Sequence, residues 1–243
     1  FELYLCHSES PPASVDRCHD GAMPIRSGPC PTLETERLIL RPFRDEDVDD
    51  YFGVLDTSEV RRWLHLPAGL NRSNAWQQMA VFLGEWALRG TGQWALEERS
   101  SGAFLGRTGL YRPEYPDWPG VEVGWTLHPD HWGRGYATEA GAAAIRYAFE
   151  DLDVDRIFSC ILPDNEASQA VAVRLGMELL EERTMDFFPS APHGIWSRSR
   201  YQPWVDRFST RRCAARTDHP WPRHLHPSCP GCGRADRSER AGR

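Results

Sequence analysis

Two glycines separated by one residue, Gly133 and Gly135, lie where a predicted strand meets a predicted helix. Residues 121–127 alternate and are rich in β-branched and aromatic side chains, which predicts a strand. Residues 138–149 are rich in alanine and contain no proline, which predicts a helix. A glycine turn at a helix N-terminus directs unpaired backbone N–H groups and the positive end of the helix dipole at one point. The stretch therefore predicts a pyrophosphate-binding site.

The spacing of these glycines separates the loop from two other phosphate-binding motifs. A dinucleotide-binding fingerprint needs G-x-G-x-x-G, and a P-loop needs G-x-x-x-x-G-K-[ST]. Residues 128–140 read HPDHWGRGYATEA and contain neither pattern. Taken alone, the loop has a simpler interpretation as an ordinary glycine turn before a helix, so the neighbouring motifs must decide.

A second polar motif follows the next predicted strand, residues 155–162. Pro163 ends that strand, a helix begins near Asn165 and Ser168, and Gly176 stops it. This strand and helix place an amide and a hydroxyl close to one another in the chain. Both groups can donate and accept hydrogen bonds.

The motifs together resemble the GNAT superfamily of acyl-CoA N-acetyltransferases, in its RimJ/RimL-like branch. Residues 132–137, WGRGYA, resemble motif A, Q/R-x-x-G-x-G/A, with Trp132 in the first position as in that branch. Residues 34–43, ETERLILRPF, are similar to the start of RimJ/RimL-like domains. Asn-x-x-Ser at 165–168, followed by RLGM at 174–177, resembles the Asn-x-x-Ser…Lys-Leu-Gly-Phe/Met signature of the second half. The resemblance covers about residues 33–205.

The resemblance implies acetyl-CoA as the cosubstrate. Backbone N–H groups of residues 133–138 would hold its pyrophosphate, and main-chain groups of the strand ending at Leu127 would hold pantetheine. Asn165 would bind it by its amide, and Arg174, in the usual Lys position, would reach its phosphates. The implied cofactor-binding residues are Trp125, Leu127, Trp132, Gly133, Arg134, Gly135, Ala137, Thr138, Asn165 and Arg174.

Two residues are predicted to manage protons during transfer. Glu122 is the expected general base for the amine, with a solvent-facing or ion-paired strand residue as the alternative. Ser168 is the expected acid for the leaving thiolate, with a helix-capping serine as the alternative. Many relatives use a tyrosine as the acid, and this helix contains none. His128 and His131 flank the glycine loop and are expected to make structural hydrogen bonds rather than catalyse.

The implied fold class is α/β (α+β), the GNAT acyl-CoA N-acyltransferase fold. It has a mixed, mostly antiparallel sheet of about seven strands with helices on both faces. A V-shaped split is expected between the strands that end at Leu127 and Leu162. The sequence predicts strands at residues 33–43, 92–98, 103–111, 121–127, 155–162, 177–188 and 194–201, and helices from residue 45, at 58–64, at 73–88, at 138–149 and at about 164–175. Trp76, Met79, Phe82, Leu83 and Trp86 are expected on one helix face. The resemblance implies that this face could contact the acceptor, with packing in the core as the alternative.

Charge and composition set the expected domain boundaries. The 243-residue chain has a net charge of −7. Residues 207–243 carry nine Arg and three acidic residues, a balance of +6, which leaves −13 for residues 1–206. An acidic body argues against nucleic-acid binding and suits a cationic acceptor. We expect a disordered leader at residues 1–31, a catalytic domain at 32–206 and a basic disordered tail at 207–243.

The predicted function is transfer of an acetyl group from acetyl-CoA directly to a primary amine. The acceptor is either a protein N-terminus, such as that of a ribosomal protein, or a small molecule, and the chain is a monomer or homodimer. Of seven cysteines only Cys160 lies in the body, and no apolar run reaches the ~20 residues of a membrane span, so we expect a cytoplasmic protein. The catalytic site needs no metal. Two alternatives remain: a non-catalytic acyl-CoA-binding module, and a zinc or nucleic-acid module in the tail, where the candidate zinc ligands are His224, His226, Cys229 and Cys232.

Overall fold

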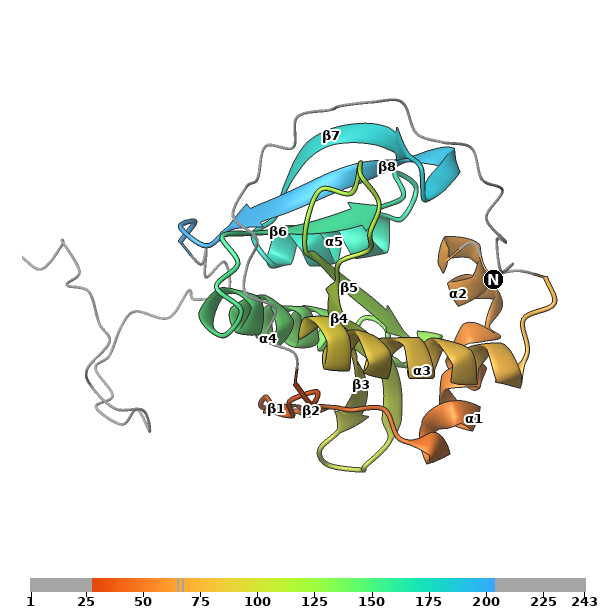
Figure 1. The fold of residues 1–243 in the computed structure, drawn as a ribbon. Coiled ribbons are helices and arrows are strands. Elements are labelled where there is room, and N and C mark those ends of the chain that lie inside the picture. The colour runs from red at the N-terminus through yellow and green to blue at the C-terminus, as the bar shows by residue number, and fades with distance from the viewer. Residues whose placement is uncertain (1–27, 65, 67, 204–243) are drawn as a thin grey trace, which may run out of the picture. The chain divides into compact units, whose positions relative to one another are not determined.

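The computed structural model describes residues 28–203 except residues 65 and 67. The strands are β1 (Leu33–Glu34), β2 (Leu38–Arg41), β3 (Gln93–Glu98), β4 (Phe104–Tyr111), β5 (Glu122–Leu127), β6 (Arg156–Ile161), β7 (Glu178–Met185) and β8 (Phe188–Ser199). They form one eight-stranded sheet in the order β1-β2-β3-β4-β5-β6-β8-β7 (Figure 1). Every neighbouring pair is antiparallel except β5 and β6, which are parallel. The mixed, mostly antiparallel fold class is confirmed.

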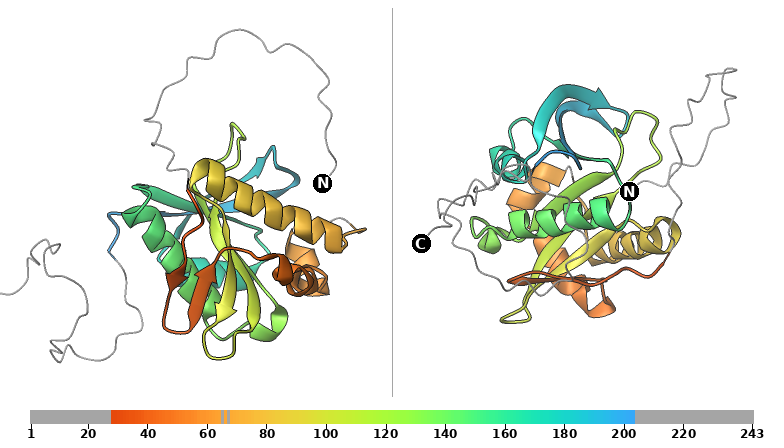
Figure 2. Two further views of the ribbon diagram at one scale, coloured as in Figure 1. Left: turned by 60° about the horizontal axis from the view of Figure 1, so that its bottom comes forward. Right: turned by 90° about the vertical axis from the view of Figure 1, so that its left-hand side faces the viewer.

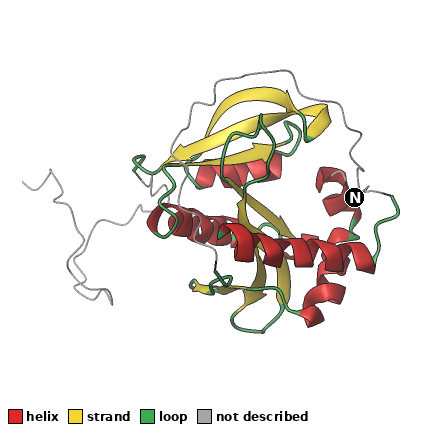
Figure 3. Ribbon diagram, in the orientation of Figure 1, coloured by secondary structure: helices red, strands yellow, loops and turns green. Residues whose placement is uncertain are grey.

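The helices lie between the strands in the predicted order (Figure 3). They are the 3-10 turns η1 (Asp45–Asp47) and η2 (Pro129–His131) and the helices α1 (Val48–Leu55), α2 (Ser58–Leu64), α3 (Arg72–Arg89), α4 (Tyr136–Glu150) and α5 (Glu166–Arg174). α3 begins after Asn71, whose side chain accepts from two backbone N–H groups, and ends at Gly90 in the left-handed conformation. None of the described helices has the length and apolar composition needed to cross a membrane.

The helices pack on both faces of the sheet, as expected (Figure 2). Successive side chains of a strand point to opposite faces. Accordingly, Trp94 and Leu96 of β3 join the core cluster that contains α4 and α5, whereas Ala95 joins the cluster of α1, α2 and α3. The glycine loop and the segment from residue 165 therefore lie on one face. α1, α2 and the rest of α3 cover the other, although Trp86 near the end of α3 joins the first cluster.

The structure corrects three details of the sequence-based fold. The strand predicted at residues 33–43 is broken at Thr35, whose hydroxyl accepts the Leu38 N–H at 3.0 Å and makes a tight turn. The sheet consequently has eight strands rather than about seven. Phe188 begins β8 instead of ending β7, because the hairpin turns just before it. On α3, Trp76 and Leu83 are exposed, and only the other three of the predicted apolar residues are buried.

The expected split lies between β5 and β6. These strands pair at a single position, Glu122 with Phe158, and Phe158 N–H donates to the Val121 carbonyl at 2.9 Å. Neither strand pairs with the other beyond that point. The later residues of β5 therefore face a gap where a parallel ladder would otherwise continue.

A buried ionic network joins β2, β3 and η1 at the edge of this domain. The Arg41 guanidinium contacts Asp47 at 2.8 Å and Glu97 at 2.7 Å, and Arg41 and Asp47 are 6% and 4% exposed. Hydrogen bonding to Asp47 raises the pKa of Arg41, although burial opposes this. Asp47 also accepts the Arg44 N–H, so this one carboxylate fixes the start of the helical layer against the sheet.

Replacing this buried carboxylate is expected to destabilise the fold. Asp47→Asn leaves the Arg41 charge buried with one anionic partner fewer, and should lower the free energy of unfolding by about 3 kcal/mol. Chemical denaturation measures the change. The matched control is Asp49→Asn, two residues along the chain, because the Asp49–Arg72 pair is exposed and should contribute little. Equal losses in both variants would contradict a structural role for the Arg41 network.

Candidate active site

The glycine loop has the backbone geometry of an anion site. Gly133 and Gly135 adopt φ values of 73° and 82°, which are left-handed conformations that favour glycine, and Gly135 immediately precedes α4. No backbone N–H from Gly133 to Thr138 donates a hydrogen bond to another described residue. Ala137 and Thr138 lie in the first turn of α4, so their N–H groups add to the positive end of the helix dipole.

An ion pair between Arg37 and Glu139 supports the glycine loop. The sequence analysis did not predict this pair. Arg37 Nε donates to Glu139 Oε2 at 2.7 Å, and Arg37 Nη1 donates to the Arg134 carbonyl at 2.9 Å. Although burial opposes it, hydrogen bonds from Thr35 and Arg37 lower the pKa of Glu139. The Arg134 carbonyl is thus tied to Arg37, and the pair neutralises a carboxylate that would otherwise repel an anion at this helix terminus. The signal in the sequence was an acidic residue in the first turn after the glycines.

Trp132 takes a structural part at the start of the loop. Its indole N–H donates to the Leu127 carbonyl at 2.8 Å, while the side chain remains 42% exposed. The residue that departs from motif A therefore ties the loop to the end of β5. Arg134, beside it, has an exposed side chain.

The main chain of β5 presents unpaired groups to the split. The Val121 carbonyl accepts a hydrogen bond from β6, and main-chain groups of alternate residues point to the same side of a strand. The N–H and carbonyl of Trp125 and the N–H of Leu127 therefore point toward the β6 side as well. β6 does not pair with β5 at these residues. These groups are available to an extended ligand lying in the gap.

Glu122 lies where the two strands separate. The Cys160 N–H, which a continuous parallel ladder would direct to β5 backbone, instead donates to Glu122 Oε1 at 3.0 Å. Burial raises the pKa of Glu122 to about 7, while the Cys160 hydrogen bond and the Arg107 charge oppose the rise. Glu122 makes no ion pair with any other described residue. A carboxylate of this kind can accept a proton near neutral pH.

Asn165 and Ser168 begin α5 on the other side of the split. Asn165 is the N-cap residue, and its side-chain oxygen accepts the Ser168 N–H at 3.1 Å, so the cap is the asparagine rather than the serine. The Ser168 hydroxyl oxygen accepts the Trp125 indole N–H at 3.3 Å. Because that bond uses an oxygen lone pair, the hydroxyl keeps its own proton for donation.

The remaining predicted residues lie around these groups. Arg174 ends α5 with an exposed side chain, and the next residue, Leu175, packs against Gly141 of α4. His128 Nδ1 accepts the Asp130 N–H at 3.3 Å. Burial, followed by the charges of Arg134 and His128, lowers the pKa of His131. His128 thus makes a structural hydrogen bond, whereas Nδ1 of His131 is buried without a partner among the described residues.

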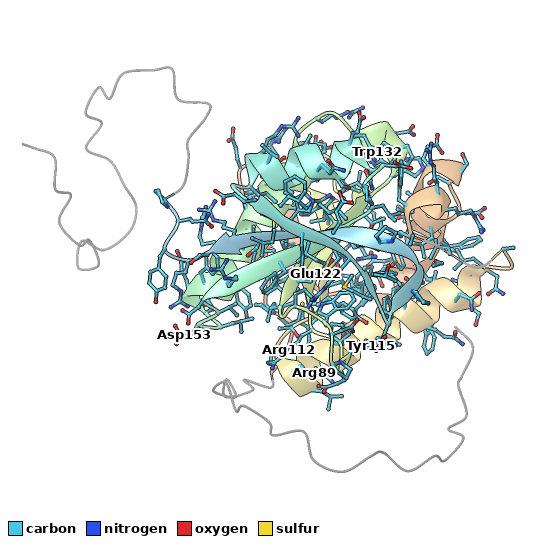
Figure 4. All side chains as sticks on the ribbon, turned by 90° about the horizontal axis from the view of Figure 1, so that it is seen from above. Arg89, Arg112, Tyr115, Glu122, Trp132 and Asp153 are labelled. Carbon is cyan, nitrogen blue, oxygen red and sulfur yellow. The ribbon has the colours of Figure 1, made fainter. Side chains whose placement is uncertain are left out.

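The loop at residues 112–120 forms a further wall near Glu122. Its aromatic rings contact the β7–β8 hairpin, with ring centroids of Tyr115 and Trp118 at 5.1 Å and 5.6 Å from Phe187. Asp117 accepts the Asp186 N–H at 2.7 Å. In the view of Figure 4, Glu122 lies between Trp132 on one side and Tyr115 on the other. The arrangement has a glycine loop with unpaired N–H groups, a carboxylate in a split sheet and an aromatic wall.

Residues 28–203, apart from the gaps at 65 and 67, contain no group of three or more His, Cys, Asp or Glu side chains placed to hold a metal ion. The candidate zinc ligands at 224–232 lie outside the described residues. The expected leader, residues 1–31, lies mostly outside the described residues, and the expected tail, residues 207–243, lies wholly outside them.

Comparisons with known proteins agree with this geometry. Residues 37–178 match the model of the acetyltransferase (GNAT) domain. An uncharacterized N-acetyltransferase of Bacillus subtilis, YoaA, is 28% identical over 148 residues, which are 61% of this chain and 83% of YoaA. An acetyltransferase structure from Agrobacterium tumefaciens is 31% identical with a TM-score of 0.60. The match covers 69% of this chain and 94% of the Agrobacterium chain.

A third comparison concerns the fold alone. The structure of Mycobacterium smegmatis RimJ in complex with CoA-disulfide is 19% identical with a TM-score of 0.56, covering 67% of this chain and 82% of its own. With more than half of the sequence matched by the domain model, the chain belongs to the GNAT acetyltransferase family and is an N-acetyltransferase of the kind that takes its acetyl group from acetyl-CoA.

Proposed function

We propose that the domain at residues 32–206 transfers the acetyl group of acetyl-CoA directly to a primary amine, with Glu122 as the general base. One observation carries this proposal: a partly buried carboxylate with a pKa near 7 lies at the point where β5 and β6 part. Its position beside unpaired β5 main chain puts a proton acceptor next to the groups that would hold the thioester.

The residues present fit acetyl-CoA. The unpaired N–H groups from Gly133 to Thr138 would bind the pyrophosphate, and the Trp125 and Leu127 main chain would bond pantetheine in the split. The exposed guanidinium groups of Arg134 and Arg174 would contribute charge to the phosphates, and Asn165 its amide nitrogen. Trp132 would fix the loop in register with β5.

Proton transfer balances the reaction. The bound thioester supplies the acetyl group; the amine nitrogen forms the new C–N bond as the C–S bond breaks. Glu122 accepts the proton that the amine loses, directly or through water. Ser168, oriented by the Trp125 indole, donates a proton to the leaving thiolate and regains one from solvent. The chain itself forms no covalent bond to the acetyl group.

We place the chain in the RimJ/RimL-like branch. Residues 34–43 and Trp132 support this, because they match the branch at both ends of the first half of the domain. The acceptor on this proposal is a protein N-terminus or a small-molecule amine. The acidic body and the carboxylate at Glu122 suit an acceptor that arrives as a cation.

Glu122→Gln is expected to lower kcat by about 100-fold or more, because the amide cannot accept a proton. In the wild type, kcat/KM should rise with pH through about 7, the pKa of Glu122, and the variant should lose that titration. Steady-state assays of thiol release at pH values on both sides of about 7 measure the loss of kcat and the pH dependence of kcat/KM. A variant with normal turnover would contradict Glu122 as the general base.

Stability provides the folding control for this variant. A raised carboxyl pKa means that the folded state favours the protonated form, so the contribution of Glu122 to stability is full below its ordinary pKa of 4.5 and is lost as pH rises through about 7. The glutamine oxygen can still accept the Cys160 N–H. Glu122→Gln should therefore be at least as stable as the wild type at pH 8, and a lower melting temperature there would show that lost activity reflects misfolding.

The glycine loop is tested by ligand-induced stabilisation. Acetyl-CoA at ~100 times its Kd should add about 2.7 kcal/mol, or about 5–10 °C in melting temperature, and Gly133→Asp should abolish the shift by placing a carboxylate in the anion site. Gly102→Asp is the matched control, because both glycines have φ of +73° and no atom within 4 Å of an added Cβ. No shift in the wild type, or equal losses in both variants, would contradict a phosphate site in the loop.

A further inference from the structure

Side chains of helix α3 contact β4 and the residue that follows it, on the face of the sheet that carries Glu122. The Arg107 guanidinium lies 5.3 Å from the centroid of the Phe82 ring, and Arg89 donates to the Arg112 carbonyl at 2.8 Å. Glu85 follows Phe82 by three residues and precedes Arg89 by four, so all three share one face of the helix. Glu85 therefore lies opposite the part of β4 between Arg107 and Arg112.

Tyr111 of β4 is near enough to both Glu85 and Glu122 for their charges to act on its phenol. Tyr111 and Glu122 are direct cross-strand neighbours, so their side chains share a face. Burial, followed by the charges of Glu85 and then Glu122, raises the pKa of Tyr111 to about 12. The charges of both carboxylates, one on α3 and one on β5, therefore act on the Tyr111 phenol.

The Glu85 carboxylate has an unmet need for a donor. Its Oε2 is buried and accepts no hydrogen bond from the described residues. The neighbouring arginines do not bond Glu85: Arg107 Nη1 donates to Gln93 at 2.8 Å while its Nε is buried without a partner among the described residues, and Arg89 pairs with Glu114 at 2.9 Å. Burial raises the pKa of Glu85 to about 7 against the charges of Arg89 and Arg107. A partly buried carboxylate without a donor is costly, and a cationic ligand would relieve that cost.

Space and aromatic surface accompany this carboxylate. At Gly124, which is two residues from Glu122 and on the same face of β5, an added Cβ would meet no atom within 4 Å. The Trp118 and Tyr111 ring centroids are 5.9 Å apart, and the Trp118 indole N–H is buried without a partner. Ring faces beside a carboxylate suit an ammonium or guanidinium group.

We propose that Glu85 binds a second positive charge of the acceptor, so that the enzyme prefers amines carrying another cationic group beyond the one that is acetylated. This inference rests on the proposed function, with Glu122 serving the reacting amine and Glu85 the distal cation. Diamines and peptides with a basic residue after the N-terminus share this chemistry.

The test compares matched acceptors in the full chain. Wild type is assayed with diaminobutane and with butylamine, and with two short peptides whose second residue is arginine or glutamine. The dicationic member of a pair should have a KM at least about ten-fold lower, as expected for a charged hydrogen bond. The pair whose two KM values differ more shows whether the second cation belongs to a diamine or to a basic residue of a peptide. Equal KM values within both pairs would overturn the proposal.

Two variants separate a specific role from a general one. Glu85→Gln should abolish the preference while butylamine turnover stays within about two-fold of the wild type, since only the distal cation loses its partner. Glu150→Gln makes the same chemical change on the exposed end of α4 and should keep the preference. Equal losses on both members of a pair in Glu85→Gln would overturn the assignment.

Binding provides a readout that does not depend on turnover. Diaminobutane should raise the melting temperature of the wild type in the presence of CoA, and the rise should be absent in Glu85→Gln and present in Glu150→Gln. If no amine is acetylated but this pattern appears, the proposed function fails and the cation site stands. If butylamine is acetylated and the pattern is absent, the function stands and the cation site fails.

Discussion

The structure depends on a parallel strand pair that forms at one position and then separates. β5 and β6 join at Glu122 and Phe158 and then diverge, so the main-chain groups of β5 that point toward β6 beyond this position have no partner in that strand. Unpaired backbone groups inside a protein carry a substantial free-energy cost unless water or a ligand meets them. The eight-stranded sheet keeps this gap because the remaining strands are paired on both sides of it, β4 with β5 and β6 with β8.

The same separation sets the acid–base chemistry. The Cys160 N–H, left without a strand partner, donates to the Glu122 carboxylate instead. That side chain is partly buried, which raises its pKa, while a single N–H donor and a nearby guanidinium oppose the rise without cancelling it. A carboxylate that titrates near neutrality is thus a consequence of where the sheet opens.

Electrostatics divides the two ends of the split. At the end of β5 the free N–H groups before and within the first turn of α4 attract anions, and Arg37 neutralises Glu139 beneath them. On the opposite sheet face the carboxylates of Glu85 and Glu122 are both partly buried, and burial raises the pKa of each. In the proposed reaction, a phosphate-bearing donor and a cationic acceptor would be drawn to different parts of the same opening.

Local pattern determined the elements of this chain. Strand alternation, the alanine-rich helix and the glycines gave α4, β5 and the turn between them nearly to the residue, because these signals act over a few neighbours. The same patterns supplied the loop residues and the asparagine before α5. They failed where a short side-chain turn at Thr35 broke a strand, and where burial on α3 depended on what packs against it.

Only the tertiary structure decided which groups meet. The contact between Glu122 and Cys160 joins residues 38 apart in sequence, and that between Arg37 and Glu139 joins residues 102 apart. The sequence analysis did not single out Glu85, because its burial and its unpartnered oxygen arise only when α3 packs on the folded sheet. Hydrophobic period and turn chemistry are local properties of a chain, whereas the burial, charge and unmet hydrogen bonds that give a side chain its chemistry come from segments brought together by folding.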